Sequence, residues 1–532
     1  MTEDHAVPAI PAWQPIPLPA IPDLPRLIDY LRHFAGVTPE AEAVIDLDGR
    51  RLTWAELTNE VERVAAVLAE RGLGAGDRIA VLAPSCGDAW VTLLAAVSLG
   101  MTWLGLNPRY TIGEMEHIIG HAQPRLVVVQ RAIHGRTYAA EIAAFERAGS
   151  PAITFDELAA MRSDSAAITA VRALQDSADP AAPCLLVYTS GSTGKPKGAL
   201  LGQAGLIACS RIQAHHYGIA GGRSVNPLPI NHVGWICDTN TTSLVTGATL
   251  VFADRFDPAR LLRAFGEERL TSWGGVPTMF QLLLEEPSAA HADFSHVRRV
   301  LWSGSPMPLD LAVRLAELGA PMHNFYGMTE TTGSVCFTAP DADIPTAVGT
   351  IGKPEASYEV RIADPETGAL CAIGETGEIQ VRSPGVMLGY LDDEAATREA
   401  FTADGWLRTG DLAEARSDGN LMLRGRSREM FKSGGFNVYP REVEIALEAH
   451  PGVAAACVVA VPDATFHEVG HAFVLVGETD APELAAVEAH ARTLLANYKV
   501  PKRITLVTAL PMLPIGKVDR KALAAKAKEM AE

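Results

Sequence analysis

Hydrophobic and polar positions along the chain alternate between two periods, and this alternation predicts the architecture. Short apolar runs typical of buried strands take turns with runs of helical period at 79–83, 89–99, 101–106, 112–122 and 126–129. The same alternation returns later, with strands expected at 248–252, 272–275 and 300–303. Strands separated by helices form parallel sheets covered by helices. The pattern therefore predicts an α/β fold whose large domain contains two such layers facing each other.

The pattern changes twice towards the C-terminus. Short alternating strands at 358–362 and 378–382 predict a small β subdomain that closes the large domain. Beyond residue 426, helices and strands mix, which predicts a small α+β cap. A chain of 532 residues is too long for one ordinary domain. We therefore expect a Pro-rich arm at 1–25, a large domain at 26–427 and a C-terminal cap domain at 428–532.

Charge and cysteine content exclude several classes of function. The net charge of -18 argues against nucleic acid or an anionic membrane surface as the main partner. The seven cysteines are scattered without a Cys-x-x-Cys pair, which favours reduced thiols in a cytoplasmic protein. The uncharged run at 89–106 divides into a helix and a strand, so no membrane span is expected. The sequence leaves the oligomeric state open, a homodimer included.

A loop rich in glycine, hydroxyl groups and lysine follows the apolar strand expected at 184–187. Glycines let backbone N–H groups face an anion, hydroxyls add donors and lysines add charge, so this composition is typical of a phosphate cradle. The loop is not a Walker A motif, because Thr189 stands where that motif needs glycine. The candidate phosphate-binding residues are Thr189, Ser190, Gly191, Ser192, Thr193, Gly194, Lys195 and Lys197.

The loop resembles the AMP-binding signature of the adenylate-forming (ANL) superfamily, and in particular its acyl-CoA synthetases and aryl-CoA ligases. Four more stretches carry the resemblance in the expected order: Asn324-Phe-Tyr-Gly-Met-Thr-Glu330, Gly405-Trp-Leu-Arg-Thr-Gly-Asp411, the run from Gly425 to Glu444, and Pro514-Ile-Gly-Lys-Val-Asp-Arg520. The resemblance covers roughly residues 25–530. It implies ATP, Mg²⁺ and CoA as ligands, and a mobile cap that serves two half-reactions.

The resemblance also implies roles for single residues. Asn324 and Tyr326 would bind the adenine end of the nucleotide, Thr329 would reach phosphate, and Glu330 would hold Mg²⁺. Asp411 would bind the ribose, since one carboxylate can accept from both hydroxyls.

The cap motifs add the residues expected to act in both half-reactions. Arg426 would join Asp411 at the ribose, and Arg428 occupies the hinge position. The residues expected to line the thiol tunnel are Lys432, Gly434 and Gly435. Lys517 would bridge the substrate carboxylate and the α-phosphate, where negative charge builds during adenylation.

The stretch Leu228-Pro-Ile-Asn-His-Val-Gly-Trp235 bears on the acid that is activated. Peptide-synthetase adenylation domains have an Asp here that holds the substrate ammonium, whereas this chain has His232. We therefore expect a fatty, aryl or polycyclic acid without an α-amino group. His232 would gate the carboxylate site or assist thiol attack, with a purely structural histidine as the alternative. Trp235, Gly304 and Met328 are candidates for the acyl pocket, although Trp and Met more often belong to a core.

These observations predict an ATP-dependent acyl-CoA synthetase that forms acyl-AMP and then transfers the acyl group to CoA. Two alternatives stay within the superfamily: a ligase that loads a carrier protein, and a member that performs only one half-reaction. A catalytically silent binding protein is disfavoured, because Lys517 and Glu330, which only the chemistry requires, are both present.

Overall fold

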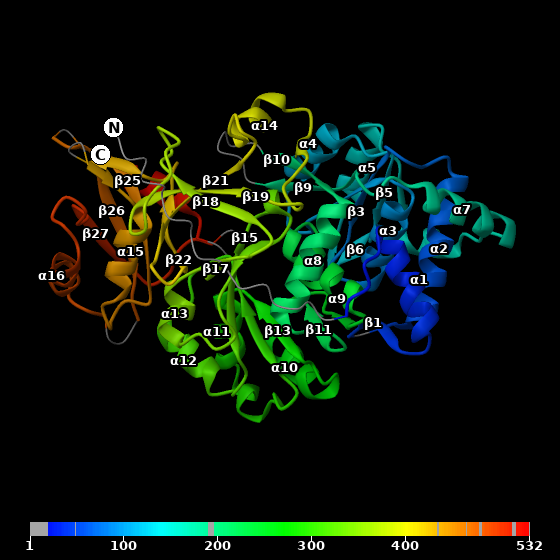
Figure 1. Cartoon of the computed structure of the whole chain (residues 1–532), viewed down its shortest axis with the longest axis horizontal. Coiled ribbons are helices and arrows are strands. Elements are labelled where there is room, and N and C mark those ends of the chain that lie inside the picture. Colours follow the sequence, from blue (N-terminus) through cyan, green and yellow to red (C-terminus); the bar gives the residue numbers. More distant parts are fainter. Residues whose placement is uncertain are drawn as a thin grey trace, which may run out of the picture.

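The structure is a computed structural model that describes residues 20–47, 49–189, 196–433, 436–463, 465–477, 481–512 and 518–530. Two large sheets with their helices form the body, and a small domain lies at one end of the long axis (Figure 1). The sequence-based prediction of an α/β body with a small α+β C-terminal unit is confirmed.

A seven-stranded sheet is built from the first alternating region, in the order β20-β10-β9-β4-β3-β5-β8. Its strands are β3 (Arg78–Leu82), β4 (Thr102–Leu106), β5 (Leu126–Val129), β8 (Ala152–Thr154), β9 (Pro183–Thr189), β10 (Lys197–Gly202) and β20 (Gly389–Tyr390). β3, β4, β5 and β8 run parallel, and β9 pairs with β4 in the same direction. β9 therefore ends at the carboxyl edge of the parallel strands, where open α/β sheets bind ligands.

A nine-stranded sheet forms the second layer, in the order β17-β16-β15-β14-β13-β11-β12-β1-β2. Its strands are β1 (Glu42–Asp46), β2 (Arg51–Thr53), β11 (Arg223–Asn226), β12 (Thr249–Phe252), β13 (Ser272–Gly275), β14 (Arg299–Trp302), β15 (Met322–Gly327), β16 (Ser334–Phe337) and β17 (Lys353–Pro354). The N-terminal hairpin β1–β2 joins this sheet because β1 pairs with β12 in parallel. A two-stranded ribbon, β6 (Ala132–Ile133) with β7 (Arg136–Thr137), stands apart from both sheets.

Helices cover and separate the two sheets. In the body they are α1 (Leu27–Val37), α2 (Trp54–Glu70), α3 (Gly87–Ser98), α4 (Ile112–Ala122), α5 (Ala139–Arg147), α6 (Phe155–Ala160), α7 (Ser165–Ser177), α8 (Gln203–Tyr217), the π-helix η1 (Gly234–Thr241), α9 (Thr242–Thr246), α10 (Pro258–Glu267), α11 (Pro277–Glu285), η2 (Pro287–His291), α12 (Leu309–Ala316), η3 (Thr329–Thr331), α13 (Ile344–Gly349) and α14 (Glu394–Ala400). α3 is buried on nearly every side, which explains why the run at 89–106 lacks charge. Within the described ranges, no helix is long and apolar enough to cross a membrane.

The C-terminal part contains two smaller sheets. β18 (Glu359–Ala363), β19 (Thr376–Arg382), β21 (Leu407–Ala415) and β22 (Leu421–Arg426) form an antiparallel sheet beside the body. The end domain combines β23 (Phe431–Ser433), β24 (Phe436–Val438), β25 (Ala455–Asp463), β26 (His467–Leu475) and β27 (Arg503–Val507) with α15 (Pro440–Glu448), α16 (Leu484–Leu494) and α17 (Arg520–Glu529). The chain passes from the first of these sheets to the second between β22 and β23.

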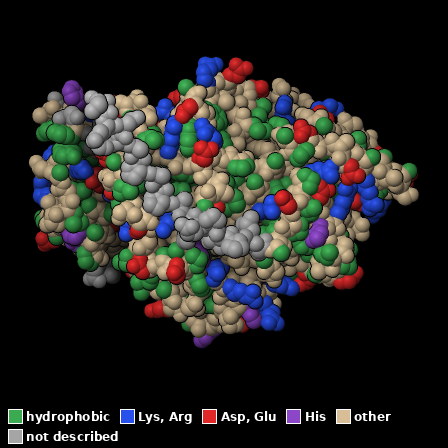
Figure 2. Space-filling view, in the orientation of Figure 1, with side chains coloured by type: hydrophobic (Ala, Val, Ile, Leu, Met, Phe, Trp, Pro, Cys, Tyr) green, Lys and Arg blue, Asp and Glu red, His purple; other side chains and the backbone are tan. Residues whose placement is uncertain are grey.

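Charged side chains lie on the surface, whereas most of the cysteines are buried. Basic and acidic side chains are interspersed over the face in Figure 2. All seven cysteines are free, and all except Cys86 and Cys371 are buried. Partial or full burial raises the pKa of every one of these thiols.

Candidate functional site

A buried carboxylate joins three segments that lie far apart in the sequence. Glu330, in the η3 turn, has 6% of its surface exposed. Its Oε1 accepts a hydrogen bond from the Tyr390 hydroxyl at 2.8 Å and one from the Thr189 hydroxyl at 3.3 Å. Thr189 ends β9 and Tyr390 ends β20, so the two hydroxyls hold Glu330 beside the start of the predicted phosphate loop.

Tyr390 is a component of the site that sequence analysis missed. Its strand β20 pairs with β10, and Lys197 Nζ lies 5.3 Å from the centre of its ring. Burial, and next the charge of Glu330, raise the pKa of the Tyr390 hydroxyl, which therefore stays protonated and donates. The sequence marks this position only by the glycine before it. In the structure Gly389 has a φ of 148°, which residues with a side chain rarely adopt.

A second buried carboxylate, Asp411, links β15 to the antiparallel sheet. The Tyr326 hydroxyl donates to Asp411 Oδ2 at 2.7 Å, and Arg426 Nε lies 3.0 Å from Asp411 Oδ1. Asp411 and Arg426 face each other because β21 and β22 pair in that register. The charge of Asp411 raises the pKa of Arg426, and burial raises that of Tyr326. The structure thus brings together three of the residues predicted to bind nucleoside.

The other two nucleotide residues predicted between 324 and 330 have different surroundings. Asn324 donates from its side-chain amide to the Thr350 carbonyl at 2.7 Å, so this amide ties β15 to the end of α13. Thr329 is half-buried in η3, directly before Glu330.

Arg428, the predicted hinge, lies near the site formed by Glu330 and Tyr390, whereas Lys432 lies apart from it. Arg428 is exposed, and its charge opposes the rise in the pKa of Tyr390. Lys432 is also exposed, with Nζ 3.9 Å from Glu366 Oε1 and its backbone N–H directed at Glu468.

Several predicted site residues lie outside the described residues. They are Ser190, Gly191, Ser192, Thr193, Gly194, Lys195, Gly434, Gly435 and Lys517, together with residues 1–19 of the predicted arm.

His232 stands at the entry to the π-helix η1. Its Nδ1 accepts from the Gly234 N–H at 3.0 Å, so in the neutral ring the proton is on Nε2. Trp235 has no exposed surface: its ring stacks on Trp103 and its indole N–H donates to Ser85 Oγ at 2.9 Å. The structure therefore gives Trp235 a packing role.

The other two acyl-pocket candidates keep accessible surface. Met328 is half-buried next to η3. Gly304 is exposed just beyond β14, with a φ of 82° that favours glycine.

The residues present fit a magnesium nucleotide. Glu330 accepts side-chain hydrogen bonds from the described residues through Oε1, which leaves Oε2 for another ligand. No group of three or more His, Cys, Asp and Glu that could hold a metal occurs in the described part of the chain. Mg²⁺ bound to polyphosphate needs only one or two carboxylates, because phosphate and water oxygens complete its shell.

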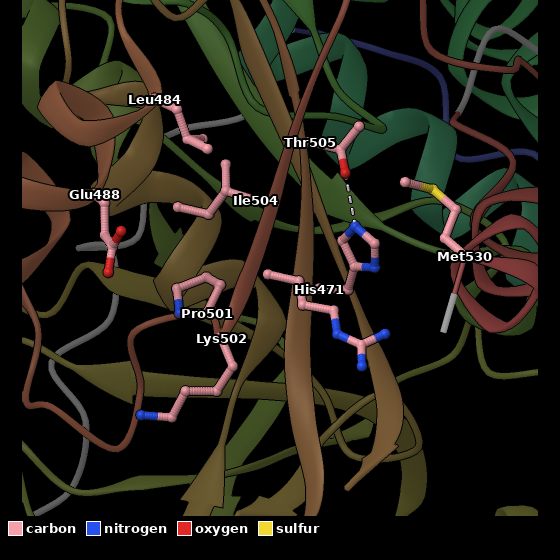
Figure 3. Close-up of a pocket in the computed structure, with 9 residues that line it drawn as sticks. His471, Leu484, Glu488, Pro501, Lys502, Ile504, Thr505 and Met530 are labelled. Carbon is pink, nitrogen blue, oxygen red and sulfur yellow. Dashed lines mark hydrogen bonds between the residues drawn. The ribbon is translucent and has the colours of Figure 1, made fainter. Parts of the chain in front are cut away.

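A pocket of about 360 Å³ lies elsewhere, in the C-terminal domain (Figure 3). Its residues come from β26, α16, β27, the two residues before β27 and the residue after α17, and include Lys502 and Arg503. His471 points towards Thr505, whose hydroxyl lies 2.8 Å from Nε2 (Figure 3). None of the residues that line this pocket belongs to the clusters around Glu330 and Asp411.

Two protein-family models match this chain. Residues 31–391 match the model described as AMP-binding enzyme, and residues 442–517 match the AMP-binding enzyme C-terminal domain. The chain belongs to the AMP-binding enzyme family. It is an acid–thiol ligase of the AMP-forming CoA ligases, which activate carboxylic acids.

Relatives of known activity span almost the whole chain. Feruloyl-CoA synthase from Amycolatopsis sp. is 35% identical over 497 residues, covering 91% of this chain and 95% of the relative. Indoleacetate–CoA ligase from Aromatoleum aromaticum is 31% identical over 504 residues, covering 93% and 97%.

Solved structures confirm the fold. ATP-bound MatB from Rhodopseudomonas palustris superposes with a TM-score of 0.84 at 28% identity, covering 96% of this chain and 100% of that one. O-succinylbenzoate CoA synthetase from Bacillus subtilis, in complex with its acyl-adenylate, gives 0.81 at 29% identity, covering 93% and 97%. The nucleotide of this AMP-binding family is thus ATP or AMP.

Proposed function

We propose that this protein is an ATP-dependent acyl-CoA synthetase that activates a fatty, aryl or polycyclic acid without an α-amino group. The observation that carries the proposal is the pair of buried carboxylates, Glu330 and Asp411, each oriented by a tyrosine hydroxyl. Two oriented acidic groups suit the two ends of a magnesium nucleotide, its phosphates and its ribose.

In the first half-reaction the carboxylate attacks the α-phosphorus and pyrophosphate leaves. Asp411, which pairs with Arg426, would orient the ribose. Lys197 and Thr189, which contact Tyr390 and Glu330, would bind the phosphates. Lys517 neutralises charge as one anion approaches another. Glu330 would hold Mg²⁺ when the metal is bound, and the metal would supply positive charge that stabilises the leaving pyrophosphate.

In the second half-reaction a thiol attacks the acyl carbonyl and AMP leaves. We propose that the cap at 428–532 turns about Arg428 and brings Lys432, Gly434 and Gly435 to the thiol path. The ion pair between Lys432 and Glu366 spans 3.9 Å between exposed side chains, and such surface pairs contribute little. Breaking this contact would therefore impede the movement of the cap only slightly.

His232 and the relatives both support the proposed class of acid. His232 stands where an ammonium-binding Asp would be needed for an amino acid. Relatives at 35% identity include feruloyl-CoA synthases and the Mycobacterium tuberculosis ligase for a methyl-dioxo-octahydro-indenyl propanoate. Aryl and fused-ring acids are therefore the first to test.

The acceptor has two candidates. Lys502 and Arg503 put positive charge on the pocket in Figure 3, and positive charge suits the phosphates of CoA or an acidic carrier protein. CoA is favoured because relatives that are 31% to 35% identical to this chain are CoA synthases or CoA ligases.

The test measures pyrophosphate release with ATP and Mg²⁺ across aryl, fused-ring and fatty acids, with and without CoA, followed by mass spectrometry. We expect acyl-AMP without CoA and acyl-CoA with it. Pyrophosphate release without a CoA thioester would contradict CoA as acceptor and favour a carrier protein or a single half-reaction. No pyrophosphate from any acid would contradict the proposal as a whole.

A further inference from the structure

A hydrogen bond between His121 and Tyr188 links a helix to the strand that leads into the predicted phosphate loop. His121 lies in the last turn of α4, and its Nδ1 is 2.8 Å from the Tyr188 hydroxyl. Tyr188 directly precedes Thr189, where β9 ends. α4 lies outside the clusters around Glu330 and Asp411, so this bond connects a further element to the site.

Tyr188 covers the base of the loop. In the antiparallel pair of β9 and β10, Tyr188 lies opposite Gly198, and Thr189 lies opposite Lys197. A methyl group built on Gly198 would meet Tyr188 Cζ at 3.3 Å, so glycine lets the tyrosine ring lie against β10. The predicted phosphate loop leaves β9 at Thr189 and joins β10 at Lys197, so the Tyr188 ring contacts both strands that carry it.

The two faces of β9 have different partners, because adjacent side chains on a strand point to opposite faces. The Tyr188 hydroxyl faces α4, whereas the Thr189 hydroxyl bonds to Glu330 Oε1 at 3.3 Å. Burial raises the pKa of the Tyr188 hydroxyl, which therefore stays protonated. It donates to Nδ1 when the His121 ring is neutral and carries its proton on Nε2. Among the described residues, His121 is the hydrogen-bond partner of this hydroxyl.

We propose that His121 is a positioning residue for the binding of the β- and γ-phosphates of ATP. It fixes Tyr188, and Tyr188 fixes the adjoining Thr189 and the opposite strand at Lys197. Thr189 bonds to Glu330, the residue expected to hold Mg²⁺ at the leaving pyrophosphate, so the β- and γ-phosphates are the ones concerned. The inference rests on the proposed function, in which Thr189 and Lys197 bind the phosphates.

The test compares the binding of ATP and of AMP by isothermal titration calorimetry, with Mg²⁺ present and without an acid, so that no reaction follows. AMP has no β- or γ-phosphate, so a residue that positions the groups around them affects ATP alone. We expect His121→Leu to weaken ATP binding by about fivefold or more and AMP binding by less than about twofold. His121→Asn should keep ATP binding within about twofold of the wild type, because Asn carries a hydrogen-bonding atom on Cγ, where His carries Nδ1.

Two further variants isolate the bond. Tyr188→Phe removes the other partner and should weaken ATP binding as His121→Leu does. The double variant should bind ATP no more weakly than the weaker single variant, because both substitutions remove the same bond. His117→Ala is the matched control, since His117 lies one turn earlier on α4 and contacts the His121 ring rather than Tyr188. It should leave both affinities unchanged.

Equal losses of ATP and AMP binding would show a merely structural role and overturn the inference. ATP binding within about twofold of the wild type in both His121→Leu and Tyr188→Phe would overturn it as well. If thermal melts show that His121→Leu does not fold, Tyr188→Phe decides, because it removes a single oxygen atom. Pyrophosphate release by the wild type tests the ligase separately: its absence, together with an ATP-specific loss in these variants, would refute the proposed function and retain the role of His121.

Discussion

Replacing Tyr390 with Phe removes one oxygen atom and isolates its hydrogen bond to Glu330. The bond measures 2.8 Å, and Thr189 supplies the other, longer one at 3.3 Å. Hydrogen bonds to charged groups contribute about 1.5 to 3 kcal/mol, which converts to about 10- to 150-fold in rate. We expect Tyr390→Phe to lower kcat/KM for adenylation by about this factor and to raise the Mg²⁺ concentration needed for half-maximal rate.

The assay is pyrophosphate release at saturating acid, with Mg²⁺ varied at fixed ATP. Tyr138→Phe is the control, because the Tyr138 hydroxyl donates at 2.8 Å to the Pro108 carbonyl, a neutral acceptor outside both carboxylate clusters. It should cost about 1 kcal/mol of stability and leave the Mg²⁺ dependence as in the wild type. The reasoning is refuted if Tyr390→Phe stays within about twofold of the wild type at every Mg²⁺ concentration, or if both variants lose activity equally.

Three further predictions address other parts of the molecule. Lys517→Ala should abolish acyl-AMP formation but still form thioester from supplied acyl-AMP, measured by mass spectrometry; retained adenylation would disprove the role of Lys517. Asp411→Asn should raise the KM for ATP by about 10-fold with little change in melting temperature, and an unaltered KM would remove Asp411 from the ribose site. Burial raises the pKa of Asp46 from 3.8 to about 6, so above that pH its ionised form weakens the folded state. Asp46→Asn, whose amide oxygen can still accept from Gly87, should therefore raise the free energy of unfolding at about pH 8 by up to about 3 kcal/mol. The melting temperature at that pH should rise accordingly. This gain should shrink as the pH falls through about 6 and vanish near about pH 4, and a gain independent of pH would contradict it.

The sequence predicts most elements of the body, because their local signals agree with the fold. The predicted helix at 112–122 is α4, bounded by a capping box in which Thr111 and Glu114 exchange hydrogen bonds. The predicted strand at 126–129 is β5. By contrast, the start of β26 at His467 has no hydrophobic signal in the sequence, because the first two residues of the strand are exposed and polar. Pairing with the end of β25 extends the strand there, and hydrophobicity does not show this.

The site is harder to predict than the fold, because it depends on contacts between distant segments. The motifs around Tyr326, Glu330 and Asp411 are recognisable one by one, but the bond from Tyr326 to Asp411 exists only once β15 and β21 are placed. Tyr390 enters the site only through the pairing of β20 with β10. The π-helix η1 has no local signal either. Asn226, from β11, donates to the Trp235 carbonyl and to the side chain of Asn240, and so helps to hold its geometry.

The buried thiols have a consequence for the chemistry of an activated acyl group. Acyl-adenylates react readily with thiolates, and a reactive cysteine nearby would be acylated in place of the intended acceptor. Because burial raises the pKa of all seven thiols, they stay protonated at neutral pH and are poor nucleophiles. The protein is thereby protected against self-acylation. A single cysteine introduced on the surface of the cap would also be the preferred target of a thiol-reactive dye, so movement of the cap could be followed without removing the native cysteines.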